Sequence, residues 1–189
     1  IIWKIIPEVK LLDANGNTAG NVDYVLVKLD SKGKIIDFGS LEVQSVYISG
    51  NLRAPFKKYM KDQDKNFTWS TTNLYPKPDY LSSSRKRLVP QIIYKGKIFN
   101  DWGKKAVVCI QKSFFETLPK FRSVDEKDGE VAWFIYDLII NKEQNKYILE
   151  LVQKKYSKFD NIIKDIITPQ AGEQSKFINV LQNKLNNSK

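Results

Sequence analysis

The first 50 residues alternate short apolar runs with polar breaks, a pattern typical of β-strands joined by turns. We expect strands over residues 5–12, 22–30 and 35–48. The polar cluster at residues 13–17 ends the first strand, and residues 31–34 form a short hairpin turn between the other two. The chain therefore begins with a meander of three strands.

From residue 51 onward, the apolar positions take the spacing of helices and of short buried strands. Helices are expected over residues 51–60 and 82–94, with a polar loop over residues 62–80 between them. The later elements are a buried strand over residues 106–115, a loop over 116–129, and strands over 131–140 and 146–153. A last helix starts at Thr168-Pro169. Its apolar stripe consists of Phe177, Ile178, Leu181 and Leu185. This order predicts an α/β (α+β) fold with a mixed central β-sheet flanked by helices.

The absence of histidine and the presence of a single cysteine exclude several classes of enzyme and metal site. The 189 residues include no histidine and one cysteine, Cys109, which lies in an apolar run and reads as an ordinary core thiol. Hydrolases with Ser-His-Asp or Cys-His centres, zinc sites of the Cys/His type and disulfide frameworks are therefore excluded. Catalysis would have to use carboxylates, amides, lysines or tyrosines, and a hard metal ion bound through oxygen stays open.

The formal net charge of +10 at pH 7 favours a polyanionic partner, most often nucleic acid. Part of the lysine excess fits an AT-rich genome. An anionic membrane surface is the weaker alternative, because no long basic amphipathic helix is visible in the sequence. No apolar run approaches the roughly 18 residues of a membrane-spanning helix.

The hairpin turn at residues 31–34 predicts which residues of the two strands face each other. A turn centred on Lys32-Gly33 places Lys28 opposite Asp37, an attractive pair of charges on one face. The other face pairs apolar residues: Leu29 with Ile36, Val27 with Phe38, and further along Val25 with Ser40. Both faces are consistent in this single register, which supports it.

The apolar face of the hairpin ends in two acidic residues, Asp23 and Glu42, directly opposite each other. Gln44 follows two residues after Glu42 and therefore lies on the same face. Two facing carboxylates repel, and a divalent cation turns this repulsion into binding. Carboxylates at this spacing suit Mg²⁺, which keeps several of its waters.

An Asp on one strand followed by Glu-x-Gln on the next resembles the core of the PD-(D/E)XK nucleases, in a D…ExQ variant. A longer match is similar to the NotI family of type II restriction endonucleases. It starts with Ile-Pro-Glu-Val at residues 6–9 and continues through residues 20–27, 37–51, 87–91, 102–105 and 114–119. The resemblance covers most of residues 5–120.

The resemblance implies roles for particular residues. Asp23 and Glu42 would be metal ligands, and Glu8 would be an additional acidic residue on the preceding strand. Gln44 stands where most of the superfamily has a lysine. Its amide can orient a water but carries no positive charge, so either the metal or a lysine from elsewhere has to supply that charge.

The resemblance also implies a fold, a cofactor and partners. We expect one domain over residues 1–189, with the catalytic core and the DNA-contacting segments in residues 1–120 and a sheet extension with a C-terminal helix in residues 121–189. Because the chain begins with Ile1 rather than Met, we expect a fragment that lacks its N-terminus. The enzyme would be a bacterial, cytoplasmic homodimer that uses Mg²⁺, cuts double-stranded DNA, and shares its restriction-modification system with a methyltransferase without binding it.

Basic residues after the acidic pair are candidates for contacts with DNA. Ser-Ser-Ser-Arg-Lys-Arg at residues 82–87 is the densest basic stretch, and its hydroxyls and arginines can bind phosphates or base edges. A basic helix face is often only solvated. The candidates are Arg53, Lys57, Ser83, Ser84, Arg85 and Arg87.

Three functions remain open from the sequence. The first is a type II site-specific deoxyribonuclease that hydrolyses both strands of a palindromic site with Mg²⁺. The second is a catalytically inactive DNA-binding protein on the same fold, disabled by the missing lysine. The third is a structural or partner-binding domain whose acidic pair binds Ca²⁺. Mg²⁺-dependent cleavage of DNA would separate the first function from the other two.

Overall fold

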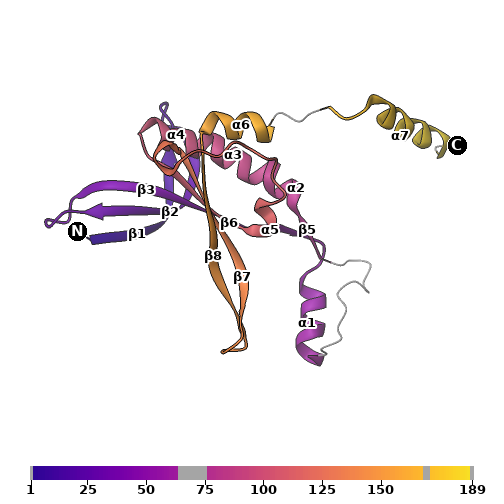
Figure 1. The fold of residues 1–189 in the computed structure, drawn as a ribbon, viewed down its shortest axis with the longest axis horizontal. Coiled ribbons are helices and arrows are strands. Elements are labelled where there is room, and N and C mark those ends of the chain that lie inside the picture. Colours follow the sequence, from indigo (N-terminus) through magenta and orange to yellow (C-terminus); the bar gives the residue numbers. More distant parts are fainter. Residues whose placement is uncertain (1, 64–75, 168–170, 188–189) are drawn as a thin grey trace.

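The computed structural model describes residues 2–63, 76–167 and 171–187 and has a mixed six-stranded sheet at its centre (Figure 1). The strand order is β1-β2-β3-β6-β7-β8. The bounds are β1 Ile2–Leu12, β2 Thr18–Leu29, β3 Ile35–Gln44, β6 Ala106–Gln111, β7 Val131–Asn141 and β8 Lys146–Ser157. β3, β6 and β7 run parallel, and the remaining pairs are antiparallel. The predicted α+β class with a mixed sheet is confirmed.

The hairpin between β2 and β3 has the predicted register. Lys28 pairs with Asp37, and Val27 pairs with Phe38. The Asp30 carboxylate closes the turn, because its Oδ1 accepts hydrogen bonds from the backbone N–H groups of Lys32 and Lys34 at 2.8 and 2.9 Å. One pair differs from the prediction.

Leu29 pairs with Ile35 instead of Ile36. The register shifts between Lys28 and Leu29, next to the turn, and the shift leaves the rest of the hairpin unchanged.

The parallel strands β3 and β6 are connected through a continuous helical run over residues 80–101. The run consists of α2 Tyr80–Ser82, a π-helical segment Ser83–Leu88, α3 Val89–Gln91, a second π-helical segment Ile92–Gly96 and α4 Lys97–Asp101. Pro90 lies between the two π-helical segments and cannot donate a backbone hydrogen bond. A wider helical turn accommodates such a residue without ending the helix. The predicted helix over residues 82–94 is confirmed, and it continues to Asp101.

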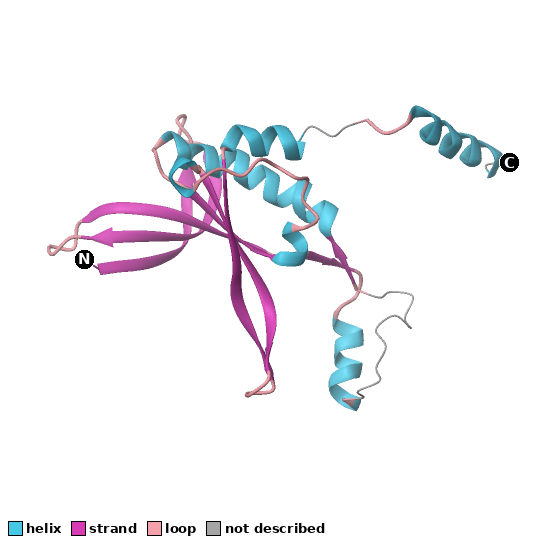
Figure 2. Cartoon of the chain, in the orientation of Figure 1, coloured by secondary structure: helices cyan, strands magenta, loops and turns pink. Residues whose placement is uncertain are grey.

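Helices cover one face of the sheet, and the main core lies beneath them (Figure 2). Ile92 from the helical run and Ile162 from α6, Phe159–Ile167, pack with Ile110 and Trp133 of the sheet. Trp133 is fully buried, and its indole N–H donates to Ser157 Oγ at 2.8 Å. A second core consists of Leu11, Val22, Val25 and Val27 from the sheet and Phe99 from α4.

Several elements differ from those expected from the sequence, including β2, which begins at Thr18 instead of residue 22, and β8, which continues to Ser157 instead of residue 153. The strand expected over residues 35–48 ends at Gln44, and β4 Tyr47–Ser49 forms a separate two-stranded sheet with β5 Lys77–Asp79. The strand expected over residues 106–115 ends at Gln111, where the short helix α5, Lys112–Phe115, begins. Phe114 of α5 is fully buried, so the apolar run continues in a helix rather than in the strand. A short 3₁₀ turn, η4 Glu126–Asp128, interrupts the loop expected over residues 116–129, and α6 was missed altogether.

Two helices contribute little to the core. α1, Arg53–Asp62, agrees with the helix predicted over residues 51–60 and projects from the sheet (Figure 1). α7, Gln174–Asn187, is the expected last helix, and its apolar stripe is exposed. The start of that helix was predicted at Thr168-Pro169, which lies outside the described residues. Within the described segments, no helix has the length and apolar character required to cross a bilayer.

Candidate active site

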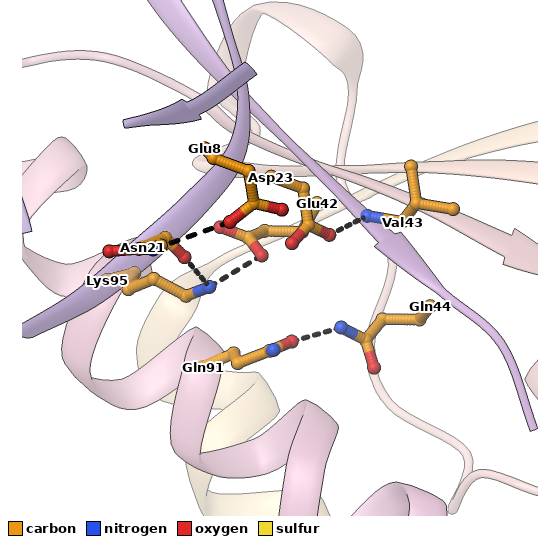
Figure 3. Close-up of polar contacts among 8 residues, drawn as sticks. All are labelled: Glu8, Asn21, Asp23, Glu42, Val43, Gln44, Gln91 and Lys95. Carbon is orange, nitrogen blue, oxygen red and sulfur yellow. Dashed lines mark hydrogen bonds and ion pairs between the residues drawn. The ribbon is translucent and has the colours of Figure 1, made fainter. Parts of the chain in front are cut away.

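Asp23 on β2 and Glu42 on β3 lie beside each other where the ladder between these strands ends (Figure 3). The last paired residues are Tyr24 and Leu41, so Asp23 and Glu42 are the next two residues in the register. The backbone N–H of Val43 donates to Asp23 Oδ2 at 2.8 Å. The structure therefore brings the two predicted metal ligands together.

Glu42 is a buried carboxylate with unequal surroundings at its two oxygens. Its residue exposure is 6%, and Oε2 lies 2.6 Å from Lys95 Nζ. Oε1 is buried and has no hydrogen-bond partner among the described residues. Burial raises the pKa of Glu42 to about 7, and the nearby Asp23 carboxylate acts in the same direction, while Lys95 lowers it. One oxygen is thus satisfied, and the other is available to a ligand.

Lys95 is the residue of this site that the sequence interpretation missed. It belongs to the π-helical segment Ile92–Gly96, and its side chain is 7% exposed. The ammonium also donates to the backbone carbonyl of Asn21 at 2.7 Å, so it contacts both strands that carry the acidic pair. The only sequence signal is its position four residues after Gln91 of the matched segment 87–91, which places both residues on one helix face.

Gln44 and Gln91 form a second contact between the same strand and the same helix. Gln44 is 7% exposed, and its Nε2 donates to Gln91 Oε1. Two strand residues at i and i+2 are about 6.6 Å apart, and two helix residues at i and i+4 rise by about 6 Å. Glu42 and Gln44 therefore match Lys95 and Gln91 in spacing, with the helix running opposite to β3.

Glu8 lies on β1, the neighbour of β2 on the edge opposite to β3, and is adjacent to Asp23 in the register. Pro7 pairs with Tyr24 and Val9 with Val22, which leaves Glu8 opposite Asp23 in the register. Glu8 is exposed, has a positive φ of 51°, and accepts a hydrogen bond from Asn21 Nδ2 at 3.4 Å. The described part of the chain contains no cluster of three or more His, Cys, Asp or Glu side chains suited to a metal ion. Glu8 therefore does not complete a three-residue cluster with Asp23 and Glu42 among the described residues.

A family model described as "Restriction endonuclease NotI" matches residues 1–149, more than three quarters of the chain. The chain belongs to the NotI restriction endonuclease family. No curated protein matches the chain. The matched region contains Glu8, Asp23, Glu42 and Gln44 as well as Gln91 and Lys95. Membership of the NotI family indicates a hydrolase of the restriction endonuclease type, and such an enzyme binds DNA.

The acidic pair of this NotI-family chain suits a hard divalent cation. Glu42 Oε1 is a buried acceptor without a partner among the described residues, and Asp23 supplies a second carboxylate next to it. Two carboxylates leave the other coordination positions of Mg²⁺ for waters and for phosphate oxygens of a substrate. Asp23 and Glu42 are therefore the residues that would hold such an ion.

The predicted DNA-contacting residues of the NotI-family chain are found in two helical segments. Arg53 and Lys57 are exposed on α1, and Arg85 and Arg87 are exposed in the π-helical segment Ser83–Leu88. The guanidinium carbon of Arg87 lies 4.9 Å from the ring centroid of Tyr47. These four side chains are accessible to a phosphate backbone.

The two serines of the basic stretch differ from each other. Ser83 is fully buried, and its hydroxyl accepts from the Tyr47 N–H at 2.8 Å and donates to the Asp79 carbonyl at 2.7 Å. The predicted DNA contact of Ser83 stays a prediction, and the structure does not favour it, because the hydroxyl is buried and both donates and accepts inside the protein. Ser84 is half-buried and donates to the Leu81 carbonyl at 3.1 Å, so it stays a candidate.

Proposed function

We propose that this NotI-family chain is a type II restriction endonuclease that cuts both strands of double-stranded DNA at a palindromic site by Mg²⁺-assisted hydrolysis of phosphodiesters. The observation that carries the proposal is the pair of Asp23 and Glu42 at the end of the hairpin ladder, with Glu42 Oε1 buried and without a partner among the described residues. The family match over residues 1–149 supports the same activity.

The metal ligands in this proposal are Asp23 and Glu42. Bound Mg²⁺ would lower the pKa of a water and stabilise negative charge on the phosphate. Asp23 is kept in place by the N–H of Val43, and Glu42 by the ammonium of Lys95. Preorganised ligands of this kind need little rearrangement when substrate arrives.

Gln44 and Glu8 position the attacking water. The contact with Gln91 fixes the Gln44 side chain, and an amide offers both a donor and an acceptor to a water molecule. Glu8 approaches the acidic pair from β1 and is exposed, so it can accept a hydrogen bond from the same water. The sugar-phosphate backbone would be bound by Arg53, Lys57, Arg85 and Arg87, with Ser84 beside them.

A palindromic target has two-fold symmetry, and we infer a homodimer whose two sites each cut one strand. A methyltransferase of the same restriction-modification system would protect host DNA by modifying the site. That enzyme reads the same sequence independently, and no complex between the two proteins is required.

The experiment that tests the proposal is digestion of several large phage DNAs with the purified chain, in Mg²⁺ and in EDTA. We expect discrete fragments in Mg²⁺ only, and cleavage reduced by about 100-fold or more by Asp23→Asn or by Glu42→Ala, since each removes a metal ligand. Glu143→Ala, which changes an exposed acid in the turn between β7 and β8, is the matched control and should cut like the parent.

Two results would contradict the proposal. Cleavage by Glu42→Ala at the parental rate would place the chemistry elsewhere in the chain. Tight, salt-sensitive binding to selected duplexes with no nicking in Mg²⁺ would instead support the catalytically inactive DNA-binding protein.

A further inference from the structure

The site contains a charge that the strand pattern does not provide. In the D…ExQ arrangement, Gln44 is neutral and cannot stabilise negative charge on a phosphate as a lysine would. The cation beside Glu42 comes from the helical run instead, as Lys95. Its Nζ lies 2.6 Å from Glu42 Oε2, inside the site rather than on its rim.

We infer that Lys95 is a positioning residue of the nuclease site: its ammonium holds Glu42 Oε2, directs the metal ion to Oε1, and supplies the positive charge that Gln44 lacks. This inference rests on the proposed function, and it assigns a role to a helix residue 53 positions away from its partner in the sequence.

The contacts of the two Glu42 oxygens support this division of roles. A carboxylate offers two oxygens, and Lys95 holds one of them while the other has no described partner. A buried polar atom without a partner is costly and uncommon, so Oε1 is the atom prepared for an incoming ligand. Lys95 thus orients Glu42 for single-oxygen coordination.

The contacts of Lys95 itself show that its position is built into the fold. The ammonium bridges β3, through Glu42, and β2, through the carbonyl of Asn21, two residues before Asp23. Its aliphatic stem passes over Gly20, where an added Cβ would lie 3.8 Å from Lys95 Cδ. Gly20 also has a φ of +107°, a conformation that side chains rarely adopt. The ammonium thus contacts both strands that carry the proposed metal ligands.

Removing the charge of Lys95 should move metal binding and cleavage in opposite directions. In Lys95→Met, compared with the parent at an alkaline pH where Glu42 is ionised in both proteins, Mn²⁺ loses a nearby repelling charge and gains access to both oxygens of Glu42, so its affinity should rise roughly threefold or more. Single-turnover cleavage in Mg²⁺ should fall about 100-fold, because the transition state loses a preorganised cation. Lys95→Gln keeps a hydrogen-bond donor without a charge and should behave in the same way.

The measurements are titration of the metal-free chain with Mn²⁺, followed by electron paramagnetic resonance of the free ion, and single-turnover cleavage. Lys97→Met is the matched control, because Lys97 lies on the same helical run but pairs with Asp101 on the surface. It should keep both parental values. If Lys95 only stabilised the fold, the opposite metal result is expected, since a partly unfolded site would bind Mn²⁺ more weakly.

The inference is overturned if the Lys95 variants cut within threefold of the parental rate, or if their Mn²⁺ affinity falls. A parent chain that binds Mn²⁺ through Glu42 but cuts no DNA would refute the proposed function alone. In that case the Mn²⁺ titrations decide the inference: tighter binding by the variants supports it and weaker binding overturns it. A parent chain that binds no Mn²⁺ would overturn both.

Discussion

Glu42 has a charge state that depends on the fold around it. Withdrawal from water raises its pKa to about 7, and the lysine at Oε2 only partly offsets this effect. In the metal-free protein, the folded state therefore keeps a proton on Glu42 at pH values where the unfolded chain has lost it. A state that holds more protons becomes less favoured as pH rises.

The stability of the metal-free protein should therefore decrease between the ordinary pKa of 4.5 and about 7 through Glu42. Urea unfolding in EDTA at several pH values measures this dependence. Glu42→Gln should flatten the decrease in that window, because an amide does not titrate there, while Glu143→Gln in an exposed turn should follow the parent. Identical pH slopes for the parent and Glu42→Gln would contradict the prediction.

The residues of the site differ in how far the sequence could predict them. Asp23 and Glu42 follow from a hairpin, because turn chemistry and alternation determine a register over short distances. Lys95 could not be predicted in this way, since its contact with Glu42 depends on how a helix docks on the sheet. The burial of Ser83 could not be predicted for the same reason. A serine in a basic stretch is expected to be accessible, and only the fold shows that its hydroxyl accepts from the Tyr47 N–H of β4.

At the level of elements, the helical run over residues 80–101 connects three parts of the fold. Its first turns hold β4 through Ser83, its middle holds β3 through Gln91 and Lys95, and its last turn covers the second core with Phe99. The hydrophobic pattern predicted a helix over residues 82–94, through Pro90, but not its extension to Asp101. A proline usually signals a helix boundary, and the π-helical segments on either side explain why the helix continues.

Ser83→Ala should weaken the junction between β4 and the helical run. The substitution removes the acceptor of the Tyr47 N–H and leaves that group without its partner, which costs about 1–3 kcal/mol of unfolding free energy. Urea denaturation of the parent, Ser83→Ala and Ser84→Ala provides the comparison. The Ser84 hydroxyl is half-buried, and its loss should cost less than about 0.5 kcal/mol. Equal effects of the two variants would argue against this junction.

At the level of the whole molecule, the two C-terminal helices differ in their contribution to folding. α6 buries Phe159, Ile162 and Ile166 in the main core, whereas no residue of α7 is buried. The sequence indicated the apolar stripe of α7 but missed α6, which is short and follows a long strand. An amphipathic stripe indicates that a surface can be buried, and it does not indicate whether this chain buries it.

Ending the chain at residue 170 should leave its melting temperature within about 2 °C of the parent, because the removed helix contributes no buried residue. Ile162→Ala is the contrasting change and should cost about 2–5 kcal/mol, since Ile162 is 2% exposed in the core. Thermal unfolding by circular dichroism measures both. A large drop in melting temperature for the shortened chain would mean that α7 contributes to folding.

The acidic pair and Lys95 are close in space but far apart in the sequence, and this has a consequence during synthesis of the chain. A ribosome releases the hairpin with Asp23 and Glu42 well before it adds residue 95, and β3 cannot pair with β6 until residues 106–111 follow. Pairings between distant segments form late in folding. An incomplete chain therefore has both carboxylates without the ammonium that contacts Glu42. Under the proposed function, a host cell meets complete active sites only after the helical run over residues 80–101 has packed against β3.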